Sequence, residues 1–285
     1  MEANAVILPC GQRLHLQHGP IDLIIGAQGD RQAAFSAATQ RFSTILEELV
    51  SELPELRLPL TRDTPTPLGD TAQRMDRAVR PTITNTYVTR MAAVAGSVAD
   101  TVLDAMKVAT LSRAYVNNGG DIALHLTKGQ TFTLAIAGHN GRDFGRITIH
   151  YDDPIRGIAT SGRHGRSFSM GIADSVTVLA ENAARADVAA TLIANSVDLP
   201  EHPAITRKPA MILDDTSDLG DLPVVVACGP LAEYDITNAL ARGRAKTDAF
   251  INQNLISGAA LFLQGHSETT CPAQLSIAQR TPHHA

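Results

Sequence analysis

Two blocks of this sequence combine residue types that could bind a phosphate and a metal ion. Residues 118–121 read Asn-Gly-Gly-Asp, and adjacent glycines can turn backbone N–H groups toward an anion while the aspartate binds the loop or the ligand. Asp187 and Thr191 are four residues apart, so on a helix their carboxylate and hydroxyl share one face, which suits a hard cation such as Mg²⁺. An ordinary hairpin turn and a solvated helix face are the competing interpretations.

Two further segments offer space and charge for a ligand. Residues 91–96, Met-Ala-Ala-Val-Ala-Gly, open a predicted helix with little side-chain bulk, which favours either a flat ligand or tight packing. Asp100, one turn later, is predicted to be exposed. Residues 157–167 form a predicted short loop, in which Ser161 could bind phosphate or a ribityl chain and His164, between two arginines, could add charge for a pyrophosphate. A solvated basic turn is the alternative for this loop.

Cys228 is a separate candidate for chemistry. It follows a predicted strand over 224–227 and precedes a Gly-Pro pair. A thiol with a lowered pKa would be nucleophilic there, whereas a buried cysteine at a strand end would be inert.

The elements that must position these residues are helices interspersed with runs of strands, which predicts the α+β class with antiparallel or mixed sheets and packed helices. Prolines and a glycine recur after Pro54, which ends the first helix, so residues 54–80 are predicted to be a loop. Residues 1–270 are predicted to form a single domain, followed by a frayed tail over 271–285. The predicted helices cover 32–53, 89–107, 183–194 and 232–253. The predicted strands cover 5–8, 13–17, 21–25, 114–116, 122–126, 131–137, 146–151, 175–180, 224–227 and 259–264.

Composition limits the classes of function. The 285 residues carry a net charge of −5, which argues against a nucleic-acid-binding protein, and a hydrophobic fraction of 44% supports a sizeable core. No apolar run is long enough to predict a membrane-spanning helix. Cys10 follows an apolar stretch of only four residues without a basic region before it, so no signal peptide is expected. With three cysteines lacking metal-ligand spacing, the expected location is the reducing cytoplasm.

The order of the blocks resembles that of the FAD:protein FMN transferases of the ApbE type. The matching blocks are, in order, Val94-Ala95-Gly96, Asn117-Asn118-Gly119-Gly120-Asp121, Thr160-Ser161-Gly162, Ser175-Val176-Thr177-Val178 and 186–191. The sequence is still more similar to an uncharacterised ApbE-like protein family, which shares 91–96, 118–121, His164 to Asp174 and 186–195. The resemblance covers roughly 10–265 and implies the ApbE-like fold.

The resemblance also implies a ligand, a metal ion and a set of site residues. FAD or FMN would bind near Gly96, Asn118, Gly119, Gly120, Asp121, Thr160, Ser161 and Gly162. Mg²⁺ would bind Asp187 and Thr191, completed by backbone carbonyls near Val94 and Ala95. If FMN transfer is retained, His164 is the candidate base and an acceptor protein is the implied partner; the helices would allow a homodimer.

Two departures from the transferase pattern keep other functions open. The His-His-Ile-Ile-Asp-Pro segment of the transferases is missing between Thr-Ser-Gly and Ser-Val-Thr-Val, and Ala95 replaces their lysine. A non-catalytic flavin-binding or interaction module is therefore the first alternative. An enzyme for a different small molecule on the same fold is the second.

Overall fold

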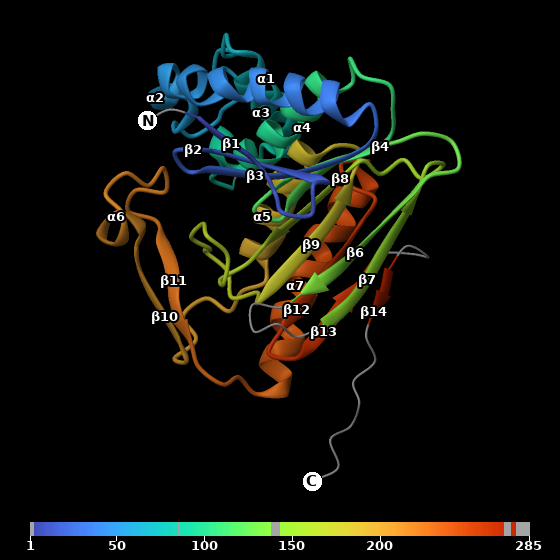
Figure 1. Cartoon of the computed structure of the whole chain (residues 1–285). Coiled ribbons are helices and arrows are strands. Elements are labelled where there is room, and N and C mark those ends of the chain that lie inside the picture. Colours follow the sequence, from blue (N-terminus) through green and yellow to red (C-terminus); the bar gives the residue numbers. More distant parts are fainter. Residues whose placement is uncertain (1–2, 85, 138–142, 271–274, 278–285) are drawn as a thin grey trace.

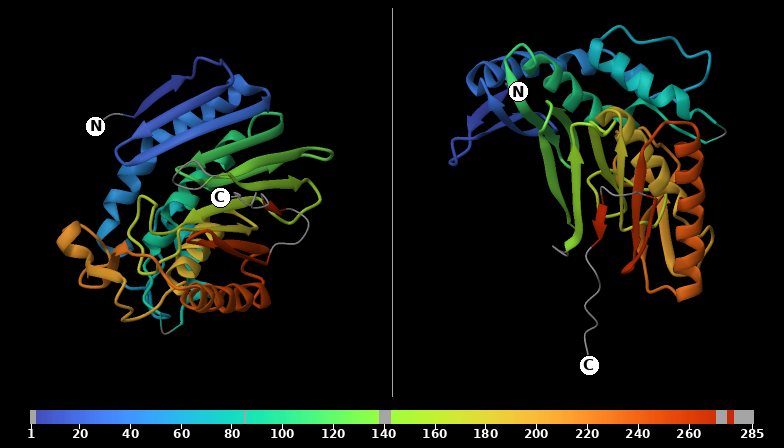
Figure 2. Two further views of the ribbon diagram at one scale, coloured as in Figure 1. Left: turned by 90° about the horizontal axis from the view of Figure 1, so that it is seen from below. Right: turned by 90° about the vertical axis from the view of Figure 1, so that its right-hand side faces the viewer.

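The protein is built in three layers around one long antiparallel sheet, as seen in a computed structural model that describes residues 3–84, 86–137, 143–270 and 275–277. Helices cover one face of this sheet, here called the helix face, and a small second sheet covers part of the opposite, outer face (Figures 1 and 2). Every strand pairing among the described residues is antiparallel. The predicted α+β class is therefore confirmed.

The long sheet has nine strands over the described residues, and the strand order brings distant parts of the chain together. The strands, in spatial order, are β1 (Asn4–Ile7), β2 (Arg13–His18), β3 (Ile21–Gly29), β4 (Leu111–Asn118), β5 (Asp121–Leu126), β8 (Gly157–Ser161), β9 (Ser175–Ala180), β12 (Gly258–Leu263) and β13 (His266–Thr269). Strand β8 thus lies between β5 and β9, so the two glycine-rich segments of the sequence share one end of the sheet.

Four helices pack side by side on the helix face. They are α1 (Arg31–Ser51), α4 (Val94–Met106), α5 (Ala183–Ser196) and α7 (Glu233–Asn252). Small residues let α4 and α5 approach each other and the sheet closely, and most of the apolar core lies between these helices and the strands. A short 3₁₀ turn (Arg90–Ala93) precedes α4, so the helix predicted over 89–107 begins irregularly.

The outer face is covered by β6 (Thr131–Ala137), β7 (Asp143–His150) and β14 (Leu275–Ile277). A second apolar cluster, including Ile122 and Ile158 of the long sheet, fills the space between the two sheets. The tail predicted over 271–285 lies outside the described residues except at 275–277. There the prediction of a frayed end is wrong, because Leu275 pairs with Ile147 of β7.

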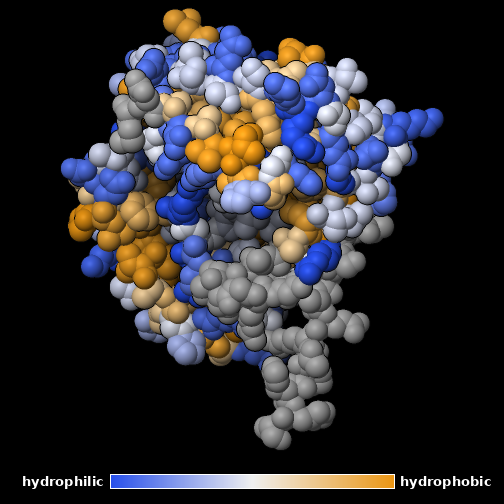
Figure 3. Space-filling model, viewed as in Figure 1, coloured by the Kyte–Doolittle hydropathy of each residue, from blue (hydrophilic) through white to orange (hydrophobic). Residues whose placement is uncertain are grey.

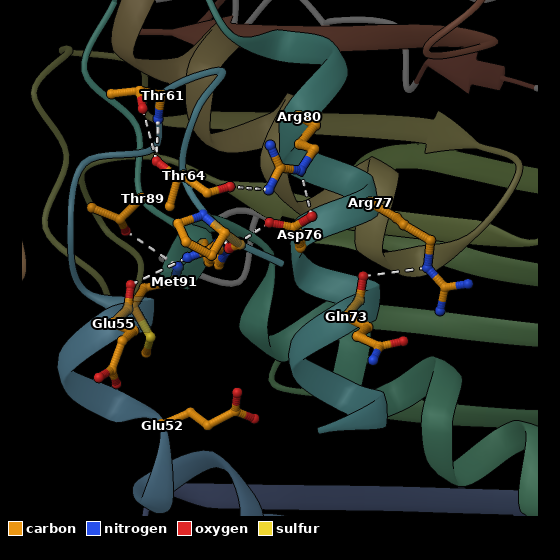
Figure 4. A network of polar contacts seen from close by, with 12 residues as sticks. Glu52, Glu55, Thr61, Thr64, Gln73, Asp76, Arg77, Arg80, Thr89 and Met91 are labelled. Atoms are coloured by element: carbon orange, nitrogen blue, oxygen red, sulfur yellow. Dashed lines mark hydrogen bonds and ion pairs between the residues drawn. The ribbon is translucent and has the colours of Figure 1, made fainter. Parts of the chain in front are cut away.

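The loop predicted over 54–80 is corrected by the structure. Pro54 does not simply end a helix but lies in the first turn of a short one, α2 (Leu53–Leu56), where a missing N–H costs nothing. A further helix, α3 (Asp70–Val79), follows, with apolar residues at helical spacing toward the core. The intervening segment is held by two arginines that both pair with the carboxylate of Asp76: buried Arg90 donates to the carbonyl of Pro65, and Arg80 donates to that of Thr64. Figure 4 shows Arg80 between Thr64 and Asp76.

A two-stranded arm stands apart from the layers. It consists of β10 (Ile205–Pro209), α6 (Ala210–Leu213) and β11 (Pro223–Cys228), of which only part of β11 was predicted (Figure 1). Met211, Ile212 and Val226 are exposed on it, and apolar colour gathers over this side of the surface in Figure 3.

Within the described part of the chain, no helix combines the length and apolar character needed to cross a membrane.

Candidate functional site

A pocket of about 340 Å³ on the outer face brings together residues that the sequence places far apart. It lies where β4, β5, β8 and β9 end beside the second sheet. Of the predicted site residues, Gly119, Gly120, Thr160, Ser161, Gly162 and His164 line it. Its other walls come from Asn117, Ile122, Leu134, Ala135, Gly165, Asp174, Ser175 and Thr177.

The glycine pair makes the tight turn between β4 and β5. Gly119 and Gly120 have φ values of +66° and +115°, which other residues adopt only with strain, and the N–H of Gly120 donates to Asn117 Oδ1 at 2.8 Å. A side chain at Gly119 would collide with the guanidinium of Arg166. The alternative of a hairpin turn is therefore correct as geometry, and the same turn forms one wall of the pocket and packs against Arg166.

The segment predicted as a short loop over 157–167 begins instead as the strand β8. Gly157, its first residue, allows the backbone at the start of α5 to come close, because a Cβ there would lie 2.0 Å from the carbonyl carbon of Asn182. Thr160 then projects to the outer face, where its hydroxyl lies 3.0 Å from that of Thr177. Only the part after Ser161 is a turn.

Ser175 is a site residue that the sequence did not single out beyond its family block. Its side chain lines the pocket and is only 6% exposed, yet its hydroxyl has no hydrogen-bond partner among the described residues. A buried hydroxyl without a partner is unfavourable by about 1–3 kcal/mol. The oxygen itself is inaccessible to solvent, so a ligand in the pocket would reach it only after a small local shift. No pattern in the sequence could have revealed that it lacks a partner.

His164 faces the pocket next to an acidic side chain. Its Nε2 lies 3.4 Å from Asp174 Oδ1, and the same oxygen accepts two hydrogen bonds from Arg163, at 2.9 and 2.6 Å. The other oxygen of Asp174 accepts from the backbone N–H of Gln264. Arg163 is therefore paired with Asp174, and the guanidinium of Arg166 packs against Gly119 in the wall of the pocket.

Two predicted site residues, Asp121 and Asp187, lie on the helix face of the same strand ends. Burial raises the pKa of Asp121 to about 7. A hydrogen bond from the backbone N–H of Thr160 and the positive charge of Arg166 lower the pKa but only partly offset the effect of burial. Burial, followed by the charge of Asp121, raises the pKa of Asp187 well above its ordinary value. Two partly buried carboxylates that repel each other form a set of oxygen ligands that a divalent cation would neutralise.

Asp187 also has a structural role, because α4 and α5 cap each other. The Oδ2 atom of Asp187 accepts from the N–H of Gly96 at 2.9 Å, at the start of α4. In return Asp100 of α4 accepts from the N–H groups of Ala183 and Ala184, at 3.1 and 2.9 Å, at the start of α5. Asp100 is thus a helix cap and not an exposed residue as predicted, and burial raises its pKa to about 6.

The remaining predicted residues complete this inner cluster and do not line the pocket. Gly96 faces α5, where a Cβ would lie 2.3 Å from the carbonyl oxygen of Ala183. Its lack of a side chain therefore serves tight helix packing, the alternative to a flat ligand for residues 91–96. Asn118 is buried and donates from Nδ2 to the carbonyl of Ala95 at 3.1 Å. Thr191 follows Asp187 by one helical turn. Among the described residues no three His, Cys, Asp or Glu side chains cluster as a metal site, so a cation here would also need hydroxyl and carbonyl ligands.

Cys228, the separate candidate, is half-buried at the end of β11. Burial raises the pKa of its thiol, and Gln264 Nε2 lies 3.7 Å from the sulfur. The thiol is therefore mostly protonated at neutral pH and is a poor nucleophile.

Comparison with known proteins assigns the chain to a family. A family model described as "AbpE bacteria" matches residues 5–269. The protein belongs to this ApbE-like family. A UPF0280 protein of Methanopyrus kandleri is 33% identical over 158 residues, which are 55% of this chain and 62% of the relative. One of Methanothrix thermoacetophila is 32% identical over 57% of this chain and 66% of the relative, so the chain spans less than two thirds of the length of both.

Solved structures with a similar arrangement carry names of flavin transferases. The flavinyl transferase ApbE of Pseudomonas stutzeri aligns over 95% of both chains, with 13% identity and a TM-score of 0.48. The ApbE protein of Thermotoga maritima aligns over 90% of this chain and 96% of its own, with 12% identity and a TM-score of 0.49. Likenesses this remote do not bear on the activity of this chain.

Proposed function

We propose that this protein binds a flavin nucleotide, FAD or FMN, in the outer pocket with Mg²⁺ at the inner carboxylates. The observation that carries the proposal is the pocket itself, where the glycine turn, the end of β8 and His164 meet around the buried, unpartnered hydroxyl of Ser175. Backbone N–H groups of the glycine turn would suit a phosphate, and Ile122 and Leu134 would suit an aromatic ring. Arg166, whose guanidinium packs against Gly119, would add positive charge beside that turn.

The metal part of the proposal rests on the donor set. Asp121 and Asp187 are partly buried, and the charge of each raises the free energy of the other's ionised form. With Thr191 and nearby backbone carbonyls they would supply the oxygen ligands that Mg²⁺ prefers. Because Asp121 directly follows the glycine turn that walls the pocket, phosphates bound at the turn would reach Mg²⁺ around the strand ends, and the ion would stabilise their negative charge.

The reaction that fits the family is transfer of FMN from FAD to a serine or threonine of an acceptor protein. The acceptor oxygen would form a bond to the FMN phosphorus while the bond from that phosphorus to the AMP oxygen breaks. His164 would take the proton of the acceptor hydroxyl at its imidazole, and Asp174 would stabilise the resulting charge. Ser175 would orient the ligand, and Arg166 would hold its phosphate.

A non-catalytic flavin-binding module is the second candidate. The observation that favours it is that Arg163 pairs with Asp174, so its positive charge is already neutralised and less of it remains for a ligand phosphate. The missing His-His-Ile-Ile-Asp-Pro segment points in the same direction.

The two candidates are separated by one binding and one transfer experiment. Fluorescence titration with FAD is expected to show quenching that Mg²⁺ strengthens. Incubation with FAD, Mg²⁺ and a serine- or threonine-bearing acceptor peptide should then add the mass of FMN to the peptide if the protein is a transferase. Binding without a mass shift would support the module, and absence of binding would contradict both.

A further inference from the structure

A second pocket, of about 370 Å³, is lined by three arginines and by no acidic residue. Arg13 comes from β2, Arg31 from the start of α1 and Arg113 from β4. Within the described part of the chain, none of the three forms an ion pair with a carboxylate. Asp30, next to Arg31, uses its carboxylate to cap α1 through the N–H of Ala33. A chain with a net charge of −5 therefore keeps three positive charges together without a balancing acid.

Two of the three arginines, Arg31 and Arg113, are held by backbone carbonyls but retain free donors. Arg31 Nε donates to the carbonyl of Ala27 at 3.1 Å, and Arg113 Nη1 donates to the carbonyl of Thr131 at 2.8 Å. A guanidinium has five N–H donors, so each keeps several for a ligand. Because these contacts fix the planar groups before binding, less side-chain entropy is lost when an anion arrives.

An aromatic ring lies among these charges. Tyr115 packs over Gly26, where a Cβ would be 2.4 Å from its ring, and it contacts Phe132 with ring centroids 5.5 Å apart. The pocket therefore combines a rigid apolar surface with convergent guanidinium groups, which bind phosphate with two parallel hydrogen bonds.

We propose that this arginine pocket is a second binding site, separate from the flavin pocket, for a small multiply charged phosphate compound. Arg113 lines the arginine pocket and Asn117 lines the flavin pocket. Both residues lie on the same face of β4, and their separation of four residues corresponds to about 13 Å along the strand. The two sites are neighbours, and each can be tested without disturbing the other.

Cys10 supplies a chemical reporter for this site. Its exposed thiol lines the pocket, and backbone and Arg13 contacts lower its pKa. A phosphate bound to Arg13 would offset that positive charge and slow alkylation of the thiol. Cys228, half-buried and outside the pocket, serves as the internal control.

The test is calorimetric titration of the full chain with inorganic pyrophosphate in Mg²⁺-free buffer at constant ionic strength. Arg31→Gln and Arg113→Gln are each expected to weaken binding by at least about tenfold, because each removes charge-assisted hydrogen bonds. Arg62→Gln, the same change on an exposed arginine outside the pocket, should leave binding unchanged. Pyrophosphate should also slow iodoacetamide labelling of Cys10 but not of Cys228, as followed by peptide mass spectrometry.

Three outcomes would overturn the proposal: no pyrophosphate binding, binding that survives both pocket substitutions, or an equal loss in Arg62→Gln. Melting curves of each variant exclude unfolding as the cause. The proposal stands apart from the flavin site, since FAD titration of Arg113→Gln should match the wild type whichever way the pyrophosphate result falls.

Discussion

The outer pocket and the inner carboxylate cluster lie on opposite faces of the same strand ends, yet they differ in how their polar groups are satisfied. In the pocket, the buried hydroxyl of Ser175 has no partner among the described residues, and 26% of the His164 side chain is exposed. In the cluster, Asp187 and Asp100 cap the two helices that cross there. As proposed, the pocket takes the ligand, whereas the cluster serves the fold and also takes a cation.

This difference predicts that substitutions on the two faces have different consequences. A change in the pocket should alter binding or transfer with little effect on stability. A change in the cluster should alter stability even without a ligand. Each prediction below either breaks this separation or makes it sharper.

The largest expected effect is on transfer, from His164→Gln. Removal of a general base lowers such rates by about 10²–10⁴-fold, while the free energy of unfolding should change little because the side chain lies at the surface of the pocket. Transfer is measured as the mass added to an acceptor peptide, and FAD binding is measured separately. Transfer at the wild-type rate would remove His164 from the mechanism.

Gly96→Ala should destabilise the protein by about 1–3 kcal/mol, because the new methyl group would overlap the backbone of Ala183. Chemical denaturation measures the effect. Gly229→Ala is the control, because Gly229 likewise has no positive φ and a Cβ there would meet Ala204 only at ordinary distances of 3.6 and 3.7 Å. If Gly96→Ala is no worse than the control, the close crossing of α4 and α5 is contradicted.

The carboxylate pair predicts a pH dependence. Since burial raises the pKa of Asp121 to about 7 from its ordinary value of 3.8, the folded state holds this proton more tightly than the unfolded state. Its contribution to stability is therefore lost as pH rises from about 4 to about 7, by at most about 1.4 kcal/mol per pH unit. Asp121→Asn should flatten this slope in denaturation series without metal; an unchanged slope would count against the pair.

The smallest effect is expected from Ser175→Ala. Because its hydroxyl lacks a partner, removing it should leave stability unchanged or raise it by up to about 1 kcal/mol. FAD binding should nevertheless weaken severalfold if the hydroxyl contacts the ligand. Thr177→Val, which removes a hydroxyl that is already paired with Thr160, is the matched control and should lower stability instead.

Local patterns in the sequence were enough to predict several elements of the fold. The strands over 131–137 and 175–180 match the structure to the residue. Helix α3 was missed because the prolines before it indicated a loop, although Ala72, Met75 and Val79 have helical spacing. The β10–β11 arm was mostly missed because its strands lie outside the long sheet and are less buried.

For the site, the sequence could supply the residues but not the two faces on which they lie. Alternation along β4 and β5 sends Asn117 and Ile122 outward and Asn118 and Asp121 toward the helices, and this depends on strand register. The mutual capping of α4 and α5 depends on how the two helices cross, which no short-range pattern contains. Asp100 was therefore expected at the surface.

The central claim is that Asp187 binds a cation that assists flavin binding in addition to capping α4. The most direct test is FAD titration with and without Mg²⁺ of the wild type, Asp187→Asn and Asp187→Ala. The asparagine keeps an acceptor for the N–H of Gly96 but loses the charge, so it should be at least as stable as the wild type at pH 8 without metal. The alanine should lose about 1 kcal/mol with the cap.

In both variants the strengthening of FAD binding by Mg²⁺ should disappear, while the wild type shows it clearly. If Asp187→Asn keeps the full Mg²⁺ effect, the carboxylate is only a helix cap and the proposed metal site is wrong.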